Sequence, residues 1–434
     1  MMDKAREIAL MVLYNIDKKD AYSNLALDEA LKQAKSDKKE IQSRDIGFIS
    51  EIVYGTVSWK LTIDEIIKKH SNIRIKKISP WILNILRMSI YQIIFLDKVP
   101  KSAAVNEGVN LAKRYGHRAS SNFVNAILRK VEKKDYEDFF SIESDMDRIS
   151  KTTSMPIWIV EELAKQNEIK KVEEICEASN LKPKLYIRVN YLKTDRQTLK
   201  KELEKQSIKV TEVENEKFLI VEGAKNIEKL KSFQEGWFSI QDEAAGLIPE
   251  QLKPQSNQKV LDACSSPGGK TTYMAELMKN QGEIKAWDIH EHRVKLVDKA
   301  ANRLGITIIQ TEEKDASIYD PQYYEYFDKV LLDVPCLGIG VIKRKPDIKW
   351  KKKKEDIEKI TTIQKAILEN CAKYLKDKGE LVYSTCSILQ EENDKIIQDF
   401  VKNNKDFKIV ENLQIYQNEK TDGFFICKMQ KNKT

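Results

Sequence analysis

Two cysteines lie in short motifs that could support nucleophilic chemistry. Cys336 ends an Asp-Val-Pro-Cys sequence, and Cys386 is the centre of a Thr-Cys-Ser sequence. Each motif follows an apolar segment, 328–333 or 380–385, with the composition of a buried strand. A single cysteine is most often a small buried hydrophobic residue. Here, however, two cysteines lie just past strand ends, and one of them is preceded by Asp-x-Pro. A pair of reactive cysteines is therefore a competing interpretation.

A glycine-rich turn connects a predicted strand, residues 259–264, to a predicted helix, residues 270–279. Its sequence is Asp-Ala-Cys-Ser-Ser-Pro-Gly-Gly-Lys-Thr over residues 262–271. Paired glycines let the backbone approach a ligand closely at a helix N-terminus. The phosphate-binding P-loop pattern fails because Cys264 stands where that pattern needs a glycine. A purely structural turn is the alternative, but the position at a first strand-to-helix turn favours a ligand site.

Asp288 ends the next predicted strand, residues 283–289. In doubly wound folds an acid at this position binds ribose hydroxyls, although it could equally cap the following helix, residues 291–303. The other three cysteines lie inside predicted helices or a strand and are predicted to be core residues. These are Cys176, Cys371 and Cys427.

The elements around these residues predict three domains. Residues 1–135 show helical periodicity throughout, which predicts an all-α bundle. A charged stretch, residues 132–147, is predicted to be a linker. Mixed short helices and strands over residues 148–236 indicate a small α+β module. Strands alternating with helices over residues 237–434 predict a doubly wound, mostly parallel α/β sheet of the Rossmann-like type.

Composition excludes several classes of protein. The 434 residues are 41% hydrophobic with few Gly and Pro, so wholesale disorder and low-complexity repeats are excluded. The six cysteines form no CxxC pair, which argues against a zinc site or a disulfide framework. The net charge of +8 is compatible with nucleic-acid binding. Without an apolar signal core or a membrane span, we expect a cytoplasmic protein and a monomer.

Taken together, the motifs resemble a known family. Asp-x-Cys-x-x-Pro-Gly-Gly-Lys-Thr, Asp-x-Pro-Cys, and Thr-Cys-Ser followed by Glu392-Asn393 are similar to the S-adenosylmethionine-dependent RNA 5-methylcytosine methyltransferases. Residues 345–350 and 422–425 also resemble that family, and residues 86–92, 99–107 and 123–129 resemble the NusB-type helical domain. A NusB-like domain joined to this catalytic domain resembles the RsmB-type methyltransferases of small-subunit (16S) ribosomal RNA.

The resemblance implies roles for the candidate residues. Cys386 would be the nucleophile that adds to cytosine C6, and Cys336 would help to release the covalent adduct. The residues alone do not rank the two cysteines. Asp333 would bind the base at N3 and the exocyclic amine, and Lys270 would face the base or lower a thiol pKa. No metal is required.

The same resemblance implies a cofactor site for S-adenosylmethionine, with the methionine part along the glycine turn, the ribose on Asp288 and the adenine amine at Asp315. A solvated loop acid is the alternative for Asp315. The implied cofactor-binding residues are Cys264, Ser265, Ser266, Pro267, Gly268, Gly269, Lys270, Asp288, Arg293, Asp315 and Asp333.

The sequence departs from the family pattern beside the Pro-Cys motif. Leu337 stands where a serine is usual, and Ile339 replaces a small or hydroxylated residue. We expect a less polar loop beside the base pocket.

RNA contacts are predicted for the helical domain, for the small module, which carries an Arg188-Val-Asn190 motif, and for a basic strip. The strip comprises residues 343–345 and 349–354, with Trp350 available for base stacking. An ordinary solvated lysine face is the alternative. The favoured function is methylation of ribosomal RNA; transfer RNA as substrate and a non-catalytic NusB-like RNA-binding protein are the alternatives.

Overall fold

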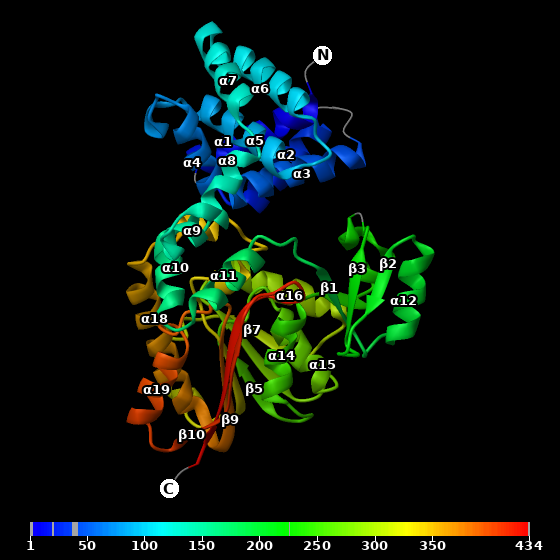
Figure 1. The fold of residues 1–434 in the computed structure, drawn as a ribbon. Helices are drawn as coiled ribbons and strands as arrows, with labels where there is room; N and C mark the ends of the chain where they lie inside the picture. Colours follow the sequence, from blue (N-terminus) through cyan, green and yellow to red (C-terminus); the bar gives the residue numbers. More distant parts are fainter. Residues whose placement is uncertain (1–2, 20, 37–41, 225, 433–434) are drawn as a thin grey trace. The chain divides into compact units, whose positions relative to one another are not determined.

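The structure is a computed structural model that describes residues 3–19, 21–36, 42–224 and 226–432 (Figure 1). The chain forms two compact units. One comprises Met1–Asn180 and Ile342–Lys352, and the other comprises Leu181–Val341 and Lys353–Thr434. In the described part of the chain, no helix is long and apolar enough to cross a membrane.

The first unit is helical, as predicted for residues 1–135. Its central helix is α5, Pro80–Phe95, which begins with proline at its first position and is apolar on nearly all sides. Such a helix must be enclosed by others, and residues 82–94 of α5 are all buried. The remaining helices are α1 (Lys4–Lys19), α2 (Ser23–Ser36), α3 (Ser43–Ser58), α4 (Lys60–His70), η1 (Ile75–Lys77), α6 (Lys101–Tyr115), α7 (Arg118–Lys130), α8 (Lys134–Glu137), η2 (Asp138–Ser141), α9 (Asp145–Thr152), α10 (Ile157–Ala164) and α11 (Ile169–Ala178).

The predicted linker at 132–147 is not an extended connection. Short helices α8, η2 and the start of α9 occupy most of it, and Tyr136 donates a hydrogen bond to the carbonyl of Thr152 at 2.9 Å. Helices α10 and α11, at the start of the predicted small module, lie in the same compact unit as the helices before them. Charge density was a poor guide here because amphipathic helices also expose charged faces.

A distant segment, Ile342–Lys352, completes the helical unit. Asp347 accepts hydrogen bonds from the backbone and hydroxyl of Ser23 at 3.1 and 2.5 Å, so it caps the first turn of α2. The indole N–H of Trp350 donates to the carbonyl of Val57 at 2.7 Å, and its ring packs against the core of the bundle. Residues Ile348–Lys351 of this segment form the short helix α17.

Lys349 is buried in the same place, with only 1% of its surface exposed. Its ammonium group donates to the carbonyls of Ser58 and Thr153 and to Oδ1 of Asn180, at 3.1, 3.4 and 2.7 Å. Burial among these neutral acceptors lowers the pKa of Lys349 to about 7. Lys349 therefore faces the protein interior, and the prediction that it contacts RNA phosphates is wrong; Trp350 is half-buried, with its indole N–H bonded within the unit.

The second unit begins with a small four-stranded antiparallel sheet in the order β2-β3-β1-β4. The alternating pattern of strands and one long helix was predicted, but β4 was missed because it has only three residues. The elements are β1 (Leu185–Val189), α12 (Arg196–Lys205), β2 (Lys209–Glu212), β3 (Phe218–Glu222), η3 (Ile227–Lys229), α13 (Lys231–Gln234) and β4 (Phe238–Ile240).

A seven-stranded sheet in the order β10-β11-β9-β8-β5-β6-β7 forms the rest of this unit. Strands β7, β6, β5, β8 and β9 are parallel. β11 pairs antiparallel with β9, and β10 pairs antiparallel with β11 at the edge of the sheet. The strands are β5 (Lys259–Asp262), β6 (Glu283–Asp288), β7 (Ile309–Glu313), β8 (Phe327–Asp333), β9 (Leu375–Thr385), β10 (Phe407–Ile415) and β11 (Phe424–Lys431). The predicted Rossmann-like class is confirmed.

Helices cover both faces of this sheet (Figure 1). Neighbouring residues of β5 point to opposite sides: Val260 packs in one apolar core with α14, α15 and α16, and Leu261 packs in another with α18 and α19. The sequence pattern predicts no helix where α14 lies. The helices are α14 (Glu243–Leu252), α15 (Gly269–Leu277), α16 (Glu291–Leu304), η4 (Pro321–Tyr323), η5 (Ile339–Val341), α18 (Asp356–Cys371), η6 (Ala372–Tyr374) and α19 (Asp394–Asn403).

Asp262 ends β5 with its carboxyl group inside the protein, 1% exposed, where it accepts a hydrogen bond from the Thr271 hydroxyl at 2.7 Å. Burial raises the pKa of Asp262 from 3.8 to about 7. The predicted core cysteines Cys176, Cys371 and Cys427 are all fully buried, which confirms that prediction.

Replacing Trp350 tests the docking of the distant segment. Trp350→Ala removes a half-buried ring and the hydrogen bond to Val57, and we expect a loss of about 2–3 kcal/mol of stability in the helical unit. Hydrogen exchange of the backbone amides at the end of α3 measures this loss. Lys353→Ala changes an exposed neighbour and should leave that exchange unaltered. Equal exchange in both variants would contradict the docking.

Replacing Asp262 tests the effect of its burial. Because the pKa is raised, protonation favours the folded state; this stabilisation is complete below about pH 4 and is lost as the pH rises through about 7. The upper limit of this stabilisation is about 4 kcal/mol, because each unit by which a pKa is shifted corresponds to about 1.4 kcal/mol. Asp262→Asn, which cannot ionise, should therefore gain stability relative to the unaltered protein between pH 4 and 8 in urea denaturation. A difference that does not change with pH would show that Asp262 ionises normally.

Candidate active site

The two motif cysteines lie together at one edge of the large sheet. Strands β8 and β9 are parallel with Asp333 opposite Ser384, so the loops that follow them leave the sheet side by side. The sulfur atoms of Cys336 and Cys386 are 2.9 Å apart, and both residues are partly exposed. Two thiols at this distance can form a hydrogen bond, with one S–H as donor and the other sulfur as acceptor.

Lys270 and Asp333 form an ion pair beside the cysteines. The ammonium group is 2.6 Å from Oδ2 of Asp333, and Oδ1 accepts a hydrogen bond from the Ser384 hydroxyl at 2.9 Å. Burial opposes the charge of Lys270, but the attraction of Asp333 and Cys386 outweighs it and raises the pKa of Lys270. Lys270 is thus a cation held beside the two cysteines.

The thiols of Cys336 and Cys264, in the same region, both have raised pKa values. The hydrogen bond with Cys386, together with burial, raises the pKa of Cys336 well above its ordinary value. Burial likewise raises the pKa of Cys264. The two motif cysteines therefore share one sulfur–sulfur contact, in which either thiol can be the donor.

The glycine turn is held in a tight loop between β5 and α15. Gly268 has φ +99°, and a Cβ there would lie 3.1 Å from Cα of Val297 in α16, so glycine is required on two counts. The backbone and hydroxyl of Ser265 both donate to the carbonyl of Trp287, at 2.8 and 2.9 Å. This places residues 264–269 against the end of β6, which carries the predicted ribose-binding acid.

Asp288 ends β6 and is almost fully buried, at 4% exposure. Oδ1 accepts the backbone N–H of His290 at 3.2 Å, and Oδ2 lies 3.5 Å from Nε of Arg293. Arg293 also reaches the carbonyl of Ser266 at 3.5 Å, so it connects the glycine turn to Asp288. Asp315 accepts from the backbone and hydroxyl of Ser317 at 2.9 and 2.6 Å, which fits a local turn as well as a ligand contact.

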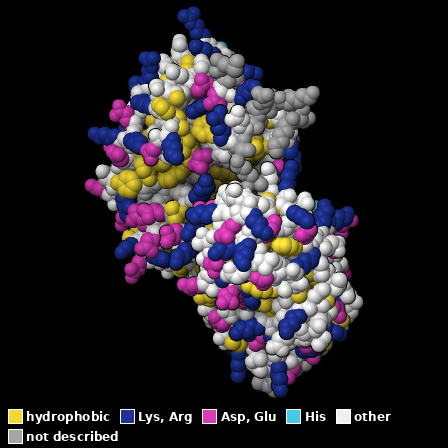
Figure 2. All heavy atoms as spheres, turned by 90° about the vertical axis from the view of Figure 1, so that its right-hand side faces the viewer, with side chains coloured by type: hydrophobic (Ala, Val, Ile, Leu, Met, Phe, Trp, Pro, Cys, Tyr) yellow, Lys and Arg dark blue, Asp and Glu magenta, His cyan; other side chains and the backbone are white. Residues whose placement is uncertain are grey.

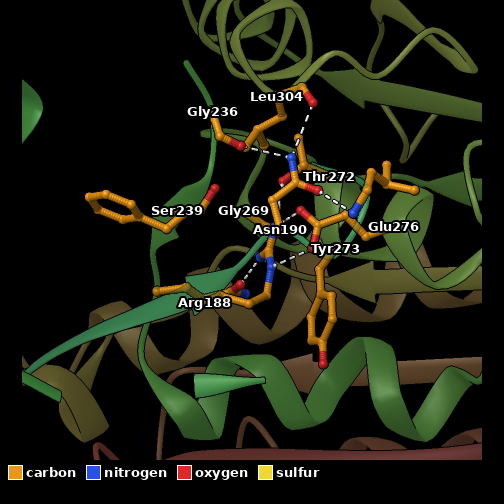
Figure 3. Close-up of polar contacts among 12 residues, drawn as sticks. Arg188, Asn190, Gly236, Ser239, Gly269, Thr272, Tyr273, Glu276 and Leu304 are labelled. Atoms are coloured by element: carbon orange, nitrogen blue, oxygen red, sulfur yellow. Dashed lines mark hydrogen bonds and ion pairs between the residues drawn. The ribbon is translucent and has the colours of Figure 1, made fainter. Parts of the chain in front are cut away.

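Arg188 supports the glycine turn from the small module (Figure 3). Its fully buried guanidinium donates to the carbonyl of Gly269 at 2.9 Å and to Thr272 and Glu276 at 3.2 and 2.7 Å. Asn190 donates to the carbonyls of Gly236 and Leu304 at 2.8 and 3.1 Å. Both side chains are committed to internal contacts, so the predicted RNA contact of the small module would have to come from other residues.

The supporting role of Arg188 was missed because a basic residue in a basic protein suggests a surface. The only sequence signal was its position inside an apolar strand, Leu-Tyr-Ile-Arg-Val, where an arginine must find buried partners. The two departures in the Pro-Cys loop are also internal. Leu337 and Ile339 are 2% and 1% exposed, so these apolar side chains enlarge the core and do not line the loop's outer surface.

Among the residues that the structure describes, no group of three or more His, Cys, Asp and Glu side chains is arranged to hold a metal ion.

Three family models match the chain in sequence order. Residues 3–133 match the NusB family, residues 155–228 match the ferredoxin-like domain of RsmF/B-like methyltransferases, and residues 249–430 match the 16S rRNA methyltransferase RsmB/F. Among solved structures, the crystal structure of PH0851 covers 99% of this chain, and all of its own chain is covered, with a TM-score of 0.82 at 25% identity. A methyltransferase homologue from Pyrococcus horikoshii covers 67% of this chain and all of its own, with a TM-score of 0.60 at 28% identity.

Curated relatives match over nearly the full length. The Bacillus subtilis protein named "Probable ribosomal RNA small subunit methyltransferase B" is 38% identical over 98% of both chains. The Proteus mirabilis ribosomal RNA small subunit methyltransferase B is 32% identical over 91% of this chain and 92% of its own. With all three domain models in the same order and this coverage, the chain belongs to the ribosomal RNA small subunit methyltransferase B family and is a methyltransferase.

Proposed function

We propose that this enzyme transfers a methyl group from S-adenosylmethionine to C5 of a cytosine in 16S ribosomal RNA, through a covalent bond between Cys386 and cytosine C6. The observation that carries the proposal is the pair of sulfur atoms 2.9 Å apart, next to the Lys270–Asp333 ion pair. Family membership supplies the methyl transfer and the class of RNA.

The chemistry explains why two cysteines are needed. Cytosine C5 is a poor nucleophile, but addition of a thiolate to C6 moves electron density onto C5, which can then take a methyl group. The C5 proton must leave next, and its departure expels the thiolate and restores the ring. One cysteine therefore forms and breaks the covalent bond, and a second group near it handles a proton.

Cys386 fits the nucleophile because the positive charge of Lys270 lies nearby. Cys336 fits the assisting group because its sulfur lies 2.9 Å from that of Cys386, within reach of the adduct that it would help to release. Asp333 is 24% exposed and held by Lys270 and Ser384, so it can accept hydrogen bonds from a cytosine without turning.

S-adenosylmethionine supplies an electrophilic methyl group when it is bound. The cradle fits such a ligand because the glycine turn keeps backbone within reach at the start of α15, and Asp288 offers a buried acceptor at the end of β6. Residues 264–269 would hold the methionine part, Asp288 with Arg293 the ribose, and Asp315 the adenine amine.

The RNA surface is distributed over the molecule. On the face in Figure 2, Lys and Arg side chains are interspersed with Asp and Glu and do not form one continuous positive area. Such a surface favours a shaped RNA that contacts several basic sites, as folded ribosomal RNA does. Transfer RNA remains the alternative substrate; nucleoside mass spectrometry of both RNAs from a deletion strain, followed by site mapping, decides between them.

The cofactor site predicts metal-independent binding of S-adenosylmethionine. Titration calorimetry after exhaustive chelation should give the same affinity as before. Asp288→Ala should weaken binding by about 1–3 kcal/mol, the usual loss for hydrogen bonds to a charged group. Glu291→Ala is the matched control, because this exposed acid pairs with Lys295 in the next turn of the helix. Equal loss in both variants would contradict the assignment.

The cysteine roles predict opposite outcomes for two variants. Cys386→Ala should bind cofactor and RNA and transfer no methyl group. Cys336→Ala should methylate once and then remain attached to the RNA, because the adduct is not resolved. Denaturing gel electrophoresis detects that covalent complex, and the double variant should lack it. A complex in Cys386→Ala would show that the two roles are reversed, and full activity in both variants would show that neither cysteine takes part.

A further inference from the structure

A single buried carboxylate joins the two cysteine loops from beneath. Glu392 lies in the loop before α19 and has no exposed surface. Its Oε2 accepts the backbone N–H of Leu337 at 2.9 Å, and its Oε1 accepts the hydroxyl of Ser387. Leu337 is the residue after Cys336, and Ser387 is the residue after Cys386. The Glu392 side chain therefore binds, in each loop, the residue that directly follows the cysteine.

Gln364 of α18 fixes the carboxylate from a third side. Its amide donates to Oε2 of Glu392 at 3.0 Å and to the carbonyl of Pro335 at 2.9 Å. The main chain of Glu392 is held as well, because Tyr383 donates to its carbonyl at 2.7 Å. Burying a carboxylate without hydrogen-bond donors has a high free-energy cost. Glu392 and its donors therefore hold one another in place.

Asn393 holds the Cys386 loop next to it. Its Oδ1 accepts the Thr385 hydroxyl at 2.6 Å, and its amide donates to the carbonyl of Ser387 at 3.1 Å. A direct bridge between the loops comes from Gly340, whose N–H donates to the carbonyl of Cys386 at 3.0 Å. Glu392 differs from both contacts because it binds both loops through one charged group.

We propose that Glu392 is a positioning residue that sets the spacing of the Cys336 and Cys386 sulfur atoms. It touches neither substrate nor cofactor and acts through the residues that follow the two cysteines. The proposal rests on the proposed function for its effect on catalysis, but the spacing itself can be measured without any RNA.

Disulfide formation measures that spacing. Dilute hydrogen peroxide oxidises one thiol to a sulfenic acid, which then condenses with the other thiol; overall two thiols and one peroxide give one disulfide and two waters. The rate of forming the Cys336–Cys386 disulfide, followed by mass spectrometry of the full-length protein, therefore reports how closely the sulfur atoms approach. Cysteines held apart form the bond slowly even when each is reactive.

Three variants separate the explanations. Glu392→Ala leaves Leu337 and Ser387 without their acceptor, and we expect disulfide formation to slow at least tenfold. Glu392→Gln keeps one acceptor oxygen for Leu337 and Gln364, and should give an intermediate rate. Glu391→Gln is the matched control: this neighbouring acid, in the turn before α19, forms an ion pair with Lys395 in the first turn of that helix, and its replacement should leave the rate unchanged.

The same variants are assayed for cofactor binding and for methylation of RNA. We expect Glu392→Ala to bind S-adenosylmethionine as the unaltered protein does, with kcat lowered and KM for RNA unchanged. An unchanged disulfide rate in Glu392→Ala overturns the proposal, and so does a slowed rate with unchanged kcat. If Glu392→Ala does not fold, Ser387→Ala decides the question, because it removes only the donor beside Cys386 and should slow the disulfide by a smaller factor.

Failure of the proposed function gives a different pattern. If the unaltered protein makes no 5-methylcytosine and forms no RNA adduct as Cys336→Ala, the catalytic roles fail whatever the disulfide rates are. A slowed disulfide in Glu392→Ala then still supports the positioning of the sulfur atoms, because that reaction needs neither RNA nor cofactor.

Discussion

The parallel pairing of β8 with β5 and with β9 is the constraint on which the site depends. Asp262 lies opposite Leu331, and Asp333 lies opposite Ser384, so three strand ends reach the same edge of the sheet. Parallel strands have all their carboxyl ends on one side, and a right-handed crossover must connect them. The glycine turn and both cysteines are therefore gathered at one place although they span residues 262–387. A shift of one residue in β8 would turn Asp333 away from Lys270.

The ion pair between Lys270 and Asp333 makes this edge reactive. Both side chains are partly shielded from water, so the interaction is stronger than a surface pair would be. Asp333 keeps Lys270 charged, and this charge lies beside Cys386. The small module contributes at a distance, because Arg188 holds the carbonyl of Gly269, the residue before Lys270. The position of the lysine thus depends on residues from two separate sheets of the same unit.

Local sequence patterns predicted the Rossmann-like class of the large sheet, most of its helices but not α14, and the positions of the two cysteines at strand ends. They succeeded because alternating apolar segments and glycine turns act within a few residues. The failures concern residues whose environment is set by distant parts of the chain. Lys349 and Trp350 stand in a lysine-rich stretch that is typical of a solvated surface, yet residues 57, 58 and 153 accept hydrogen bonds from them. Glu392 was noticed as part of a motif, but only the structure brings Leu337 to its carboxylate.

The segment Ile342–Lys352 has a consequence for how the protein is synthesised. The ribosome delivers Met1–Asn180 first, and all of residues 181–341 must follow before the last piece of the helical unit exists. Until then Ser23 at the start of α2 lacks the acceptor that Asp347 provides, and the Val57 carbonyl lacks the indole of Trp350. The helical unit therefore finishes folding late, after most of the second unit has left the ribosome. The helical unit can therefore reach its native state only after the Pro-Cys loop has been synthesised, because Cys336 precedes this segment by only a few residues.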